Sequence, residues 1–451
     1  MSNKQKQWGA IIIMIALFAM IAFVTNLCSP MAVIVKNQFG ASNLEAQIGN
    51  YGNFIAYLVM GIPSGMLIKR FGYKKTALLA LLVGIVGIFV QWMSGWESMA
   101  DSAFAVYLVG AFIGGFCMCM LNTVVNPMLN ILGGGGNTGN QLIQIGGVFN
   151  SAAAVAVYIL MGALIGDAAK ATVSDATPAL FIAGGIFIIA FIVLLFSKIE
   201  EPAQATASKK ANAKPDKYSA FSFRHFRLGI LAIFLYMGVE VGTPTYILQY
   251  LTGAPDAATP GMGMDAGIVG QLVAVYWFMM LIGRFIGGSI GGKVSSRQMI
   301  SVVGATAVIL TAFGMFAPTS WTVNIPGVDW ANLSMVWAEV PVGIFAFILI
   351  GLCSSVMWGG IFNLAVEGLG KYTAIASGAF MTMVFGCAVM VALQGWIADI
   401  TGSYMTSYWV VLGCAAYILF YALWGSKNVN NDIPVGNEDE EMTGEALENA
   451  I

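Results

Sequence analysis

One uncharged apolar stretch, residues 178–197, decides the class of fold, and it reads PALFIAGGIFIIAFIVLLFS. A helix needs roughly 20 mainly apolar residues to cross the hydrocarbon of a bilayer, because every backbone amide must be satisfied within the segment. This stretch is long enough, and it is too continuous for a barrel strand, which alternates every second residue. It therefore predicts a transmembrane helix.

Similar stretches recur along the 451 residues, of which 58% are hydrophobic and only 9% are charged. Soluble domains are about a quarter charged, because their surfaces face water. A chain so poor in charge can face lipid over most of its surface. Twelve spans are predicted, at approximately 9–33, 46–68, 76–94, 104–130, 141–165, 178–197, 226–251, 267–292, 298–317, 338–366, 372–397 and 405–425.

The placement of charge predicts the orientation of these spans. With the N-terminus in the cytoplasm, nearly all Lys and Arg residues fall in cytoplasmic loops, tails or helix ends, as the positive-inside bias requires. The outer loops then hold acids such as Glu97 and Asp256. The first apolar run follows Lys4 and Lys6 and lasts about 25 residues, so we expect a retained span and not a signal peptide. We expect a multi-pass protein of the bacterial cell inner membrane, embedded in the lipid bilayer, with both termini cytoplasmic.

A polar stretch from Ser197 to about Phe223 interrupts the apolar pattern near the midpoint. Its lysines lie among Ala, Ser and Thr, which is typical of a linker. It separates two sets of six spans, and the chain ends in an acidic tail. The predicted parts are a six-helix bundle at 1–197, a cytoplasmic linker at 198–224, a second six-helix bundle at 225–426 and an acidic disordered cytoplasmic tail at 427–451.

The two halves share weak repeats at an offset of slightly more than 200 residues. Asn26-Leu-Cys-Ser-Pro30 matches Glu240-Val-Gly-Thr-Pro244, with a polar residue four before Pro in each. Spans two and eight each end in two glycines four apart followed by cations, which lets helices approach closely. Repeated six-helix halves suit alternating access, in which one half rocks against the other around a central site.

The end of span two, residues 65–75, reads GMLIKRFGYKK and resembles the loop motif of the major facilitator superfamily. The resemblance implies an all-α membrane protein with twelve transmembrane helices in two pseudo-symmetric six-helix bundles. It also implies gating roles for Lys69 and Arg70. The family usually has Asp where Lys69 stands, so one ion pair of its gate is not carried over. Arg284 ends span eight at the corresponding place and is predicted to act in gating or as a helix-end anchor.

Six shorter stretches resemble the fucose–galactose–glucose:proton symporter family, and they lie at 126–133, 139–142, 147–151, 236–240, 282–285 and 367–371. This resemblance implies a secondary transporter that imports a monosaccharide or small saccharide together with a cation. The family's coupling acids in spans one and four align with Ser29 and Asn122 in this chain. Coupling through those two acids therefore does not carry over.

Glu240 is the candidate for ion coupling, because it lies near the middle of span seven. An ionised carboxylate there costs at least a few kcal/mol, so a proton or sodium would have to neutralise it before it crosses a closed state. The alternative is a buried acid that neighbouring amides satisfy and that holds two helices together. Coupling by proton, coupling by sodium and uncoupled facilitation all stay open at this point.

Sugar binding requires neutral donors and acceptors, together with aromatic faces for the C–H side of the ring. The candidates in the first half are amides, and those in the second half are mainly aromatic. They are Asn26, Asn122, Asn126, Gln141, Gln144, Asn150, Tyr276, Trp277, Trp358 and Asn363. Each amide alone could instead be an interhelical hydrogen bond. As a cluster, they favour a binding site shared by the halves.

Other classes of function find less support in the sequence. The glycine run 133–136 lacks the Gly-Lys-Ser/Thr ending of a phosphate loop, and the only histidine, His225, lies in a basic segment. The six cysteines lie within spans without metal-site spacing. We expect a monomer without a cofactor, metal, catalytic residue or nucleic-acid partner. The rival hypotheses are an exporter of a small amphipathic compound and a non-transporting membrane sensor.

Overall fold

The computed structural model describes residues 8–39, 43–165, 172–174, 176–197, 199, 217–264, 266–329, 334–430 and 432–435. Within these residues, eleven segments are long and apolar enough to cross a membrane. Helix α5 (Gly136–Ile165) adds a further helix of 30 residues. The predicted arrangement of twelve membrane-spanning segments is confirmed.

The first half contains six long helices, which follow the six predicted spans. They are α1 (Trp8–Phe39), α2 (Asn43–Phe71), α3 (Tyr73–Met93), α4 (Ala103–Leu132), α5 and α6 (Thr177–Phe196), with a 3₁₀ turn at Glu97–Ser102 before α4. Most are slightly longer than predicted, because a helix continues past the apolar core into the polar boundary of the bilayer. Helix α1 begins at one end of the bundle, and we call this end the α1-start end.

The second half contains spans that are broken into shorter pieces. Its elements are α8 (Arg224–Met237), a π-helical segment (Gly238–Gly242), α9 (Thr243–Thr252), α10 (Ala266–Ile290), α11 (Ser296–Phe316), β1 (Thr322–Asp329), β2 (Ser334–Pro341), α12 (Val342–Ser354), α13 (Met357–Val366), α14 (Thr373–Thr382), a 3₁₀ turn (Met383–Phe385), α15 (Gly386–Thr401), α16 (Tyr404–Ser407), α17 (Trp409–Phe420) and a second π-helical segment (Tyr421–Gly425). Short 3₁₀ turns at Ala220–Ser222 and Gly370–Tyr372 precede α8 and α14.

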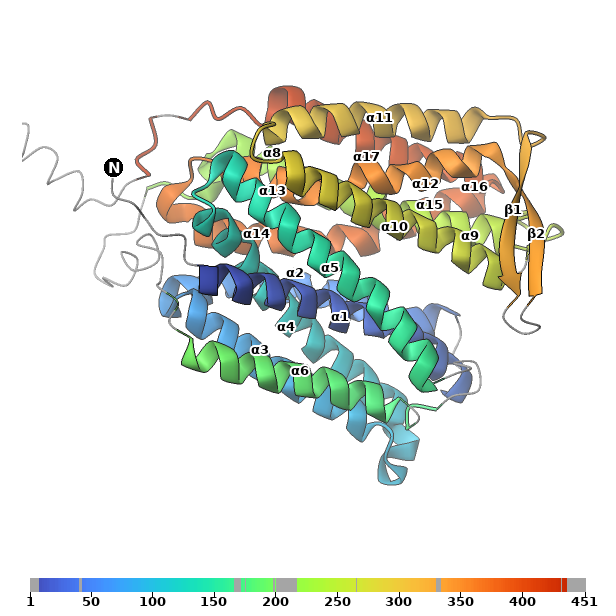
Figure 1. Cartoon of the computed structure of the whole chain (residues 1–451), viewed down its shortest axis with the longest axis horizontal. Coiled ribbons are helices and arrows are strands. Elements are labelled where there is room, and N and C mark those ends of the chain that lie inside the picture. The colour runs from blue at the N-terminus through green and yellow to red at the C-terminus, as the bar shows by residue number, and fades with distance from the viewer. Residues whose placement is uncertain are drawn as a thin grey trace, which may run out of the picture.

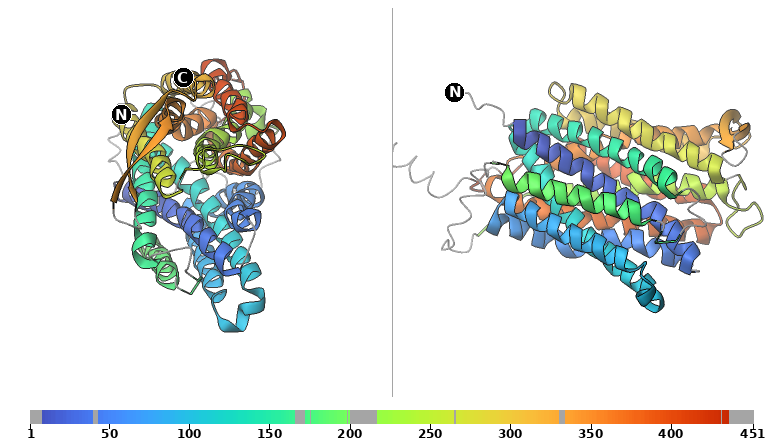
Figure 2. Two further views of the ribbon diagram at one scale, coloured as in Figure 1. Left: turned by 90° about the vertical axis from the view of Figure 1, so that its right-hand side faces the viewer. Right: turned by 60° about the horizontal axis from the view of Figure 1, so that its bottom comes forward.

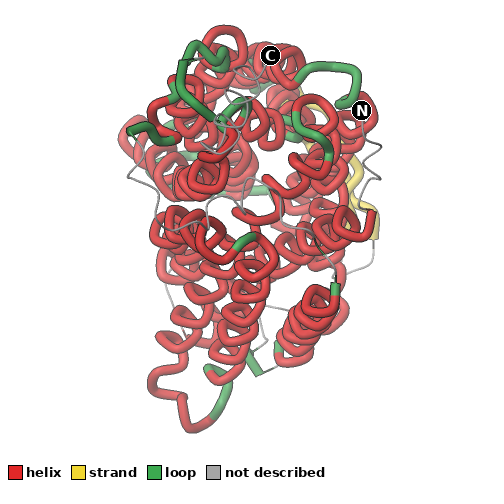
Figure 3. The backbone as a smooth tube through the Cα atoms, turned by 90° about the vertical axis from the view of Figure 1, so that its left-hand side faces the viewer, coloured by secondary structure: helices red, strands yellow, loops and turns green. Residues whose placement is uncertain are grey.

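The halves lie side by side with their helices roughly parallel (Figure 1). Views along the helices show the α1–α6 half and the α8–α17 half on opposite sides of the molecule (Figure 2, left, and Figure 3). Two seams join them. The first seam joins α2 to α14, and the second joins α5 to α10 and α13 and also joins α4 to α13. Helices α5 and α10 lie together near the α1-start end and diverge toward the other end in Figure 1.

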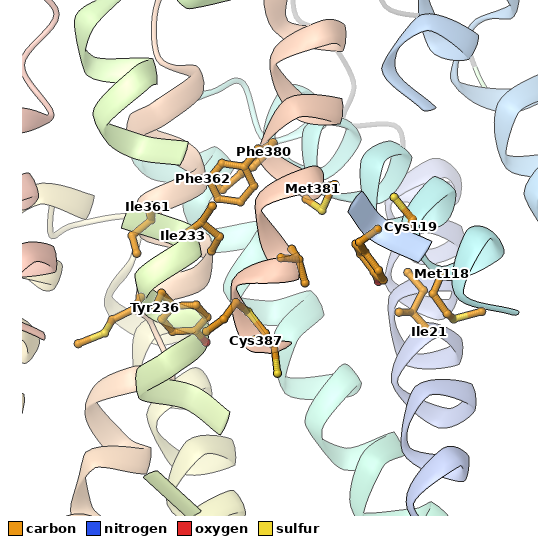
Figure 4. Packing of buried hydrophobic residues seen from close by; sticks show 14 of the residues in the cluster. Ile21, Met118, Cys119, Ile233, Tyr236, Ile361, Phe362, Phe380, Met381 and Cys387 are labelled. Atoms are coloured by element: carbon orange, nitrogen blue, oxygen red, sulfur yellow. The ribbon is translucent and has the colours of Figure 1, made fainter. Parts of the chain in front are cut away.

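Apolar side chains fill the interior of each half. Phe362 of α13 and Phe380 of α14 meet edge to face with ring centroids 5.1 Å apart, and Ile233 of α8 lies beside them (Figure 4). Ile21 and Met118 pack together in the first half in the same view. Large apolar residues also cover the outside, where Phe196 is 80% exposed and Ile309 is 67% exposed. Such an outer surface fits contact with lipid.

The strands β1 and β2 are an addition to the predicted membrane helices. They form an antiparallel hairpin that pairs Thr322 with Pro341 and Asp329 with Ser334. The predicted span 338–366 therefore begins too early, since its first four residues belong to β2 and helix α12 starts at Val342. Exposure alternates along β2, with Trp337 and Glu339 exposed and Ala338 and Val340 buried. Alternating exposure with a period of two is typical of a strand. The apolar residues of β2 run directly into those of α12, so the hydrophobicity of the sequence assigned both to one span.

The predicted linker and tail lie mostly outside the described residues. The described part of the tail, 427–430 and 432–435, is bound to the α1-start end. The Asn430 side chain accepts from the backbone N–H of Arg224 at 2.9 Å, and the Val435 carbonyl accepts from the N–H of Lys371 at 3.2 Å. Ile433 is buried. These described residues of the tail therefore contact the bundle, and the rest of the predicted tail lies outside the described residues.

Candidate functional site

Glu240 lies on the π-helical segment between α8 and α9. Two glycines bound this segment, and Pro244 follows. Because proline has no N–H, Pro244 donates no bond to the Glu240 carbonyl four residues earlier. The hydroxyl of Tyr276, on α10, donates to that carbonyl at 3.0 Å. The local sequence thus interrupts the regular helix at the acid, and a neighbouring helix supplies the missing donor.

The Glu240 carboxylate forms an ion pair with Arg284 of α10, with Oε1 and Nη2 3.6 Å apart. The two side chains are only 13% and 11% exposed, respectively. A buried charge is strongly unfavourable unless it is paired, so each residue stabilises the other in its charged form. The small exposed fractions leave this pair within reach of water or a solute.

Arg284 also crosses the second seam. Its Nη1 donates to Ser151 Oγ at 2.7 Å, to Asn150 Oδ1 at 3.0 Å and to the Gly147 carbonyl at 3.2 Å, all on α5. A Cβ at Gly147 would lie 3.1 Å from Arg284 Cδ, so the glycine leaves room for the arginine. The guanidinium therefore links the acid of one half to helix α5 of the other.

Asn150 extends this connection to α1, because its Nδ2 donates to the Phe18 carbonyl at 2.8 Å. A continuous set of bonds thus runs from Glu240 through Arg284 and Asn150 to the first helix. Such a polar path is strongest when every member is satisfied, and removing one member leaves the others unpaired.

A second polar path begins at Trp358 of α13. Its indole Nε1 donates to Asn126 Oδ1 of α4 at 3.1 Å. Asn126 Nδ2 in turn donates to the Asn122 carbonyl at 2.9 Å, and Asn122 Nδ2 donates to Tyr57 Oη of α2 at 2.7 Å. The Trp358 ring also lies 6.1 Å from Tyr236 and 6.0 Å from Phe380, centroid to centroid. We call these two paths together the inter-half polar cluster.

Three other predicted sugar-binding amides close the second seam nearer the α1-start end. Asn363 Oδ1 accepts from Asn130 Nδ2 at 2.6 Å, and Asn363 Nδ2 donates to Ser296 Oγ at 2.9 Å. Gln144 donates to the Val356 carbonyl and Gln141 donates to the Gly288 carbonyl, each at 3.0 Å. In this arrangement of the halves, Gln141, Gln144 and Asn363 therefore hold helices together.

The remaining predicted residues lie around these groups. Trp277 is partly buried and meets Tyr276 edge to face at 5.4 Å. Lys69 and Arg70 are exposed at the end of α2, and the Arg70 guanidinium lies 5.2 Å from the ring of Phe71. The side chain of Asn26 lies outside the described residues.

Sequence reasoning missed three residues of the cluster: Tyr236, Ser151 and Tyr57. A signal existed for Tyr236, which stands one helical turn before the intramembrane acid. Ser151 lies in the stretch 147–151 that resembles the symporter family, but the resemblance gave it no role, and nothing local in the sequence singles out Tyr57. A separate cavity lies inside the first half, between α1, α2, α3, α4 and α6, where Thr25, Asn53 and Gln91 are among its lining residues. It does not include the inter-half polar cluster.

Residues 13–392 match the family model of the Major Facilitator Superfamily, which covers most of the chain. The chain belongs to the major facilitator superfamily. Its relatives include a glucose/galactose transporter of Brucella abortus, 27% identical over 95% of this chain and 97% of the relative. The L-fucose-proton symporter of Escherichia coli is 22% identical over 92% of this chain and 93% of that protein.

Two solved structures of this superfamily share the fold. The transporter FucP in the outward conformation superimposes with a TM-score of 0.76 at 21% identity, covering 93% of this chain and 99% of FucP. The proton:xylose symporter XylE superimposes with a TM-score of 0.67 at 12% identity, covering 94% of this chain and 96% of XylE. At these identities the superpositions establish the arrangement of the helices and do not identify a substrate.

Proposed function

We propose that the chain is a secondary transporter that imports a monosaccharide or small saccharide, coupled to a cation through Glu240. The observation that carries the proposal is the inter-half polar cluster, in which Glu240, Arg284 and Asn150 connect the two halves across a buried seam. The named relatives that transport glucose, galactose or fucose support a sugar as the substrate class.

The sugar would bind where neutral side chains of both halves meet. Asn122, Asn126 and Asn150 offer amides, and Trp358 offers both an indole N–H and an aromatic face. Sugar hydroxyls can replace the bond between Trp358 and Asn126, since a hydroxyl both donates and accepts. We propose that Gln141, Gln144 and Asn363 close the seam nearer the α1-start end and do not bind the sugar, because their bonds lie at that end and not at the inter-half polar cluster. Tyr276 donates to the Glu240 carbonyl, which gives it a structural role. Trp277 stays in the proposed set because it lies beside Tyr276. The proposed role of Asn26 rests on the sequence alone.

Coupling would act through Arg284, which touches both the acid and α5. While Glu240 is ionised, its charge helps to hold Arg284 in place. A proton or sodium ion on Glu240 removes that attraction and changes how tightly Arg284 joins the halves. Binding energy that differs between two arrangements of the halves shifts their populations, which is the requirement for alternating access.

The charge distribution supports placement in the inner membrane of a bacterium with both termini cytoplasmic. The α1-start end is then the cytoplasmic end, where Lys69 and Arg70 are proposed to act in gating. The bonds of the second seam close this end, so the structure would present the site toward the outside. We propose a monomer as the working unit.

An uncoupled sugar facilitator is the second candidate, and the Glu240–Arg284 ion pair itself favours it. An acid that is paired with a buried arginine has its charge compensated without any transported ion. In that case Glu240 would be a structural partner of Arg284, and uptake would follow the sugar gradient alone.

Counterflow of radiolabelled monosaccharides into proteoliposomes, with and without sodium and a pH gradient, tests the proposal. The unmodified protein should exchange at least one sugar and accumulate it when the correct ion gradient is present. Glu240→Gln should retain exchange and lose accumulation, because the amide cannot bind or release a proton. Accumulation that is unchanged in Glu240→Gln would rule out coupling at this residue, and absence of exchange for every sugar would rule out the function.

A further inference from the structure

The described part of the tail ends beside the entry to helix α14. The Val435 carbonyl accepts from the N–H of Lys371 at 3.2 Å, and Ile433 is buried nearby in the chain. Gly370 has a positive φ of 48°, and a Cβ on it would collide with Val435, so only a glycine allows the tail to approach this loop so closely. The residues that follow Val435 therefore start from the α1-start end of the second half, directly before α14.

Helix α14 lies against the end of α2, which belongs to the first half. A Cβ on Gly65 would lie 2.7 Å from the Ala374 carbonyl, and one on Gly378 would lie 2.5 Å from the Gly61 carbonyl. Because residue numbers fall along α2 as they rise along α14, the two helices are antiparallel. The last turn of α2 therefore lies at the level of the loop before α14, where the described tail ends.

Positive charge gathers where α2 ends and α3 begins. Residues 65–75 contain four cations and no acid. One of them, Lys74, is partly buried and caps the end of α6, where its Nζ donates to the Ser197 carbonyl at 2.7 Å. The other three are exposed, and we call them the basic turn: Lys69, Arg70 and Lys75.

The residues after Val435 carry the opposite charge. Residues 436–451 contain no Lys or Arg, and their six acids are Glu438, Asp439, Glu440, Glu441, Glu445 and Glu448. Glu438 follows Val435 by three residues, which span at most about 10 Å, roughly the diameter of one helix. The acids therefore begin within reach of the basic turn, and the tether at Val435 raises their effective concentration there.

We propose that the acidic segment 436–451 binds the basic turn through ion pairs and so holds α14 of the second half against α2 of the first. A single exposed ion pair is weak, but several pairs on one tether act together. Salt screens such exposed pairs, so the contact is sensitive to ionic strength. The proposal concerns how the halves are held together, and it does not depend on which solute is transported.

Carbodiimide cross-linking tests the contact, because this reagent joins a carboxylate directly to a lysine that touches it. The full chain is treated in lipid nanodiscs, and mass spectrometry of the digested protein identifies the joined residues. Acids of 436–451 should be joined to Lys69 or Lys75. Salt at about 1 M should strongly reduce these links, since it shortens the range of the attraction to about 3 Å. Lys293 is the matched control, because it is exposed on the turn after α10 and should form few such links.

Two altered tails test whether the contact holds the first seam closed. One chain ends at Val435, and the other keeps its length but has the six acids of 436–451 replaced by the corresponding amides. Each also carries Thr382→Cys, because Thr382 is buried against Gly61 in the first seam. A water-soluble maleimide should label this cysteine several-fold faster in both altered chains than in the chain with the unaltered tail. Melting temperatures verify that all three chains are folded.

Every result bears on the proposal. Links to Lys69 or Lys75, together with faster labelling for both altered tails, support it. No links, or links to Lys293 as frequent as those to the basic turn, overturn it, because the acids then lie in water or against another partner. Equal labelling rates in the three chains also overturn it, since the segment then does not hold the seam. Faster labelling in the truncated chain alone overturns it as well, because charge is then not the cause.

Discussion

The two seams between the halves are built in different ways. In the first seam, α2 and α14 approach through glycines: a Cβ on Gly378 would lie 2.5 Å from the Gly61 carbonyl, and one on Gly65 would lie 2.7 Å from the Ala374 carbonyl. The hydroxyls of Ser64 and Thr382 nearby bond to carbonyls of their own helices. In the second seam, amides and Arg284 bond across from one half to the other.

The difference separates two tasks. A seam of glycines depends on shape, and an added methyl group disfavours its closure. A seam of hydrogen bonds can exchange its partners for the hydroxyls of a ligand or for water at little net change in free energy. We therefore assign to the second seam the response to sugar and ion, and to the first seam the close approach that the closed arrangement requires.

Removing the charge of Arg284 from the second seam should change stability and transport more than the other substitutions in the two seams. Arg284→Ala leaves the buried carboxylate of Glu240 unpaired, which costs about 3–5 kcal/mol. A large fall in melting temperature and loss of transport are expected. The double variant Arg284→Ala with Glu240→Gln should recover much of the stability, since no unpaired charge remains. Equal melting temperatures for the single and double variants would contradict the role of the ion pair.

An added methyl group in the first seam should have an intermediate effect. Gly378→Ala places a Cβ against the Gly61 carbonyl, and overpacking of this kind costs about 1–3 kcal/mol. The halves should then favour the arrangement in which this seam is open, with slower sugar exchange. Gly413→Ala is the matched control, because a Cβ there meets nothing within 4 Å. If both variants exchange sugar at the same rate, the first seam does not depend on shape.

Breaking one amide pair in the second seam should have the smallest effect on the stability of this arrangement of the halves. Asn363→Ala removes the bonds to Asn130 and Ser296 and should destabilise this arrangement of the halves by about 1–2 kcal/mol. The reactivity of a cysteine introduced at the α1-start end, such as Thr138→Cys, should rise accordingly. Asn130→Ala with Asn363→Ala should lose little more than Asn363→Ala alone, because the pair acts as a unit. Additive losses would show that the two residues act separately.

The sequence could predict the features that depend on composition along the chain. The apolar stretches predicted twelve spans, and the motif at 65–75 identified the superfamily, because both signals are local and repeated. Glu240 stood out for the same reason, as an acid within an apolar segment. Strand β2 could not be separated in the same way, because Met335 to Ala338 are a continuous apolar run that leads toward helix α12.

The partners of the site residues could not be predicted in this way. Arg284 is 44 positions from Glu240, and only the relative rotation of α8 and α10 brings them together. The roles of the amides depend on the same geometry. Asn126 and Gln144 are both amides within apolar segments, so the sequence does not distinguish them. Asn126 accepts from the indole of Trp358, whereas Gln144 donates to the backbone carbonyl of Val356, the N-cap residue of α13.

The distance between α5 and α10 at the α1-start end shows whether the second seam opens when sugar and ion bind. Spin labels on Thr138→Cys of α5 and Ser289→Cys of α10 would lie on either side of this seam at the α1-start end, where both residues are exposed. The five described native cysteines are buried. Pulsed electron paramagnetic resonance should show that sugar, together with the coupling ion, lengthens the distance between the labels in the unmodified background. The same distance distribution with and without sugar and ion would mean that the second seam does not respond to its ligands.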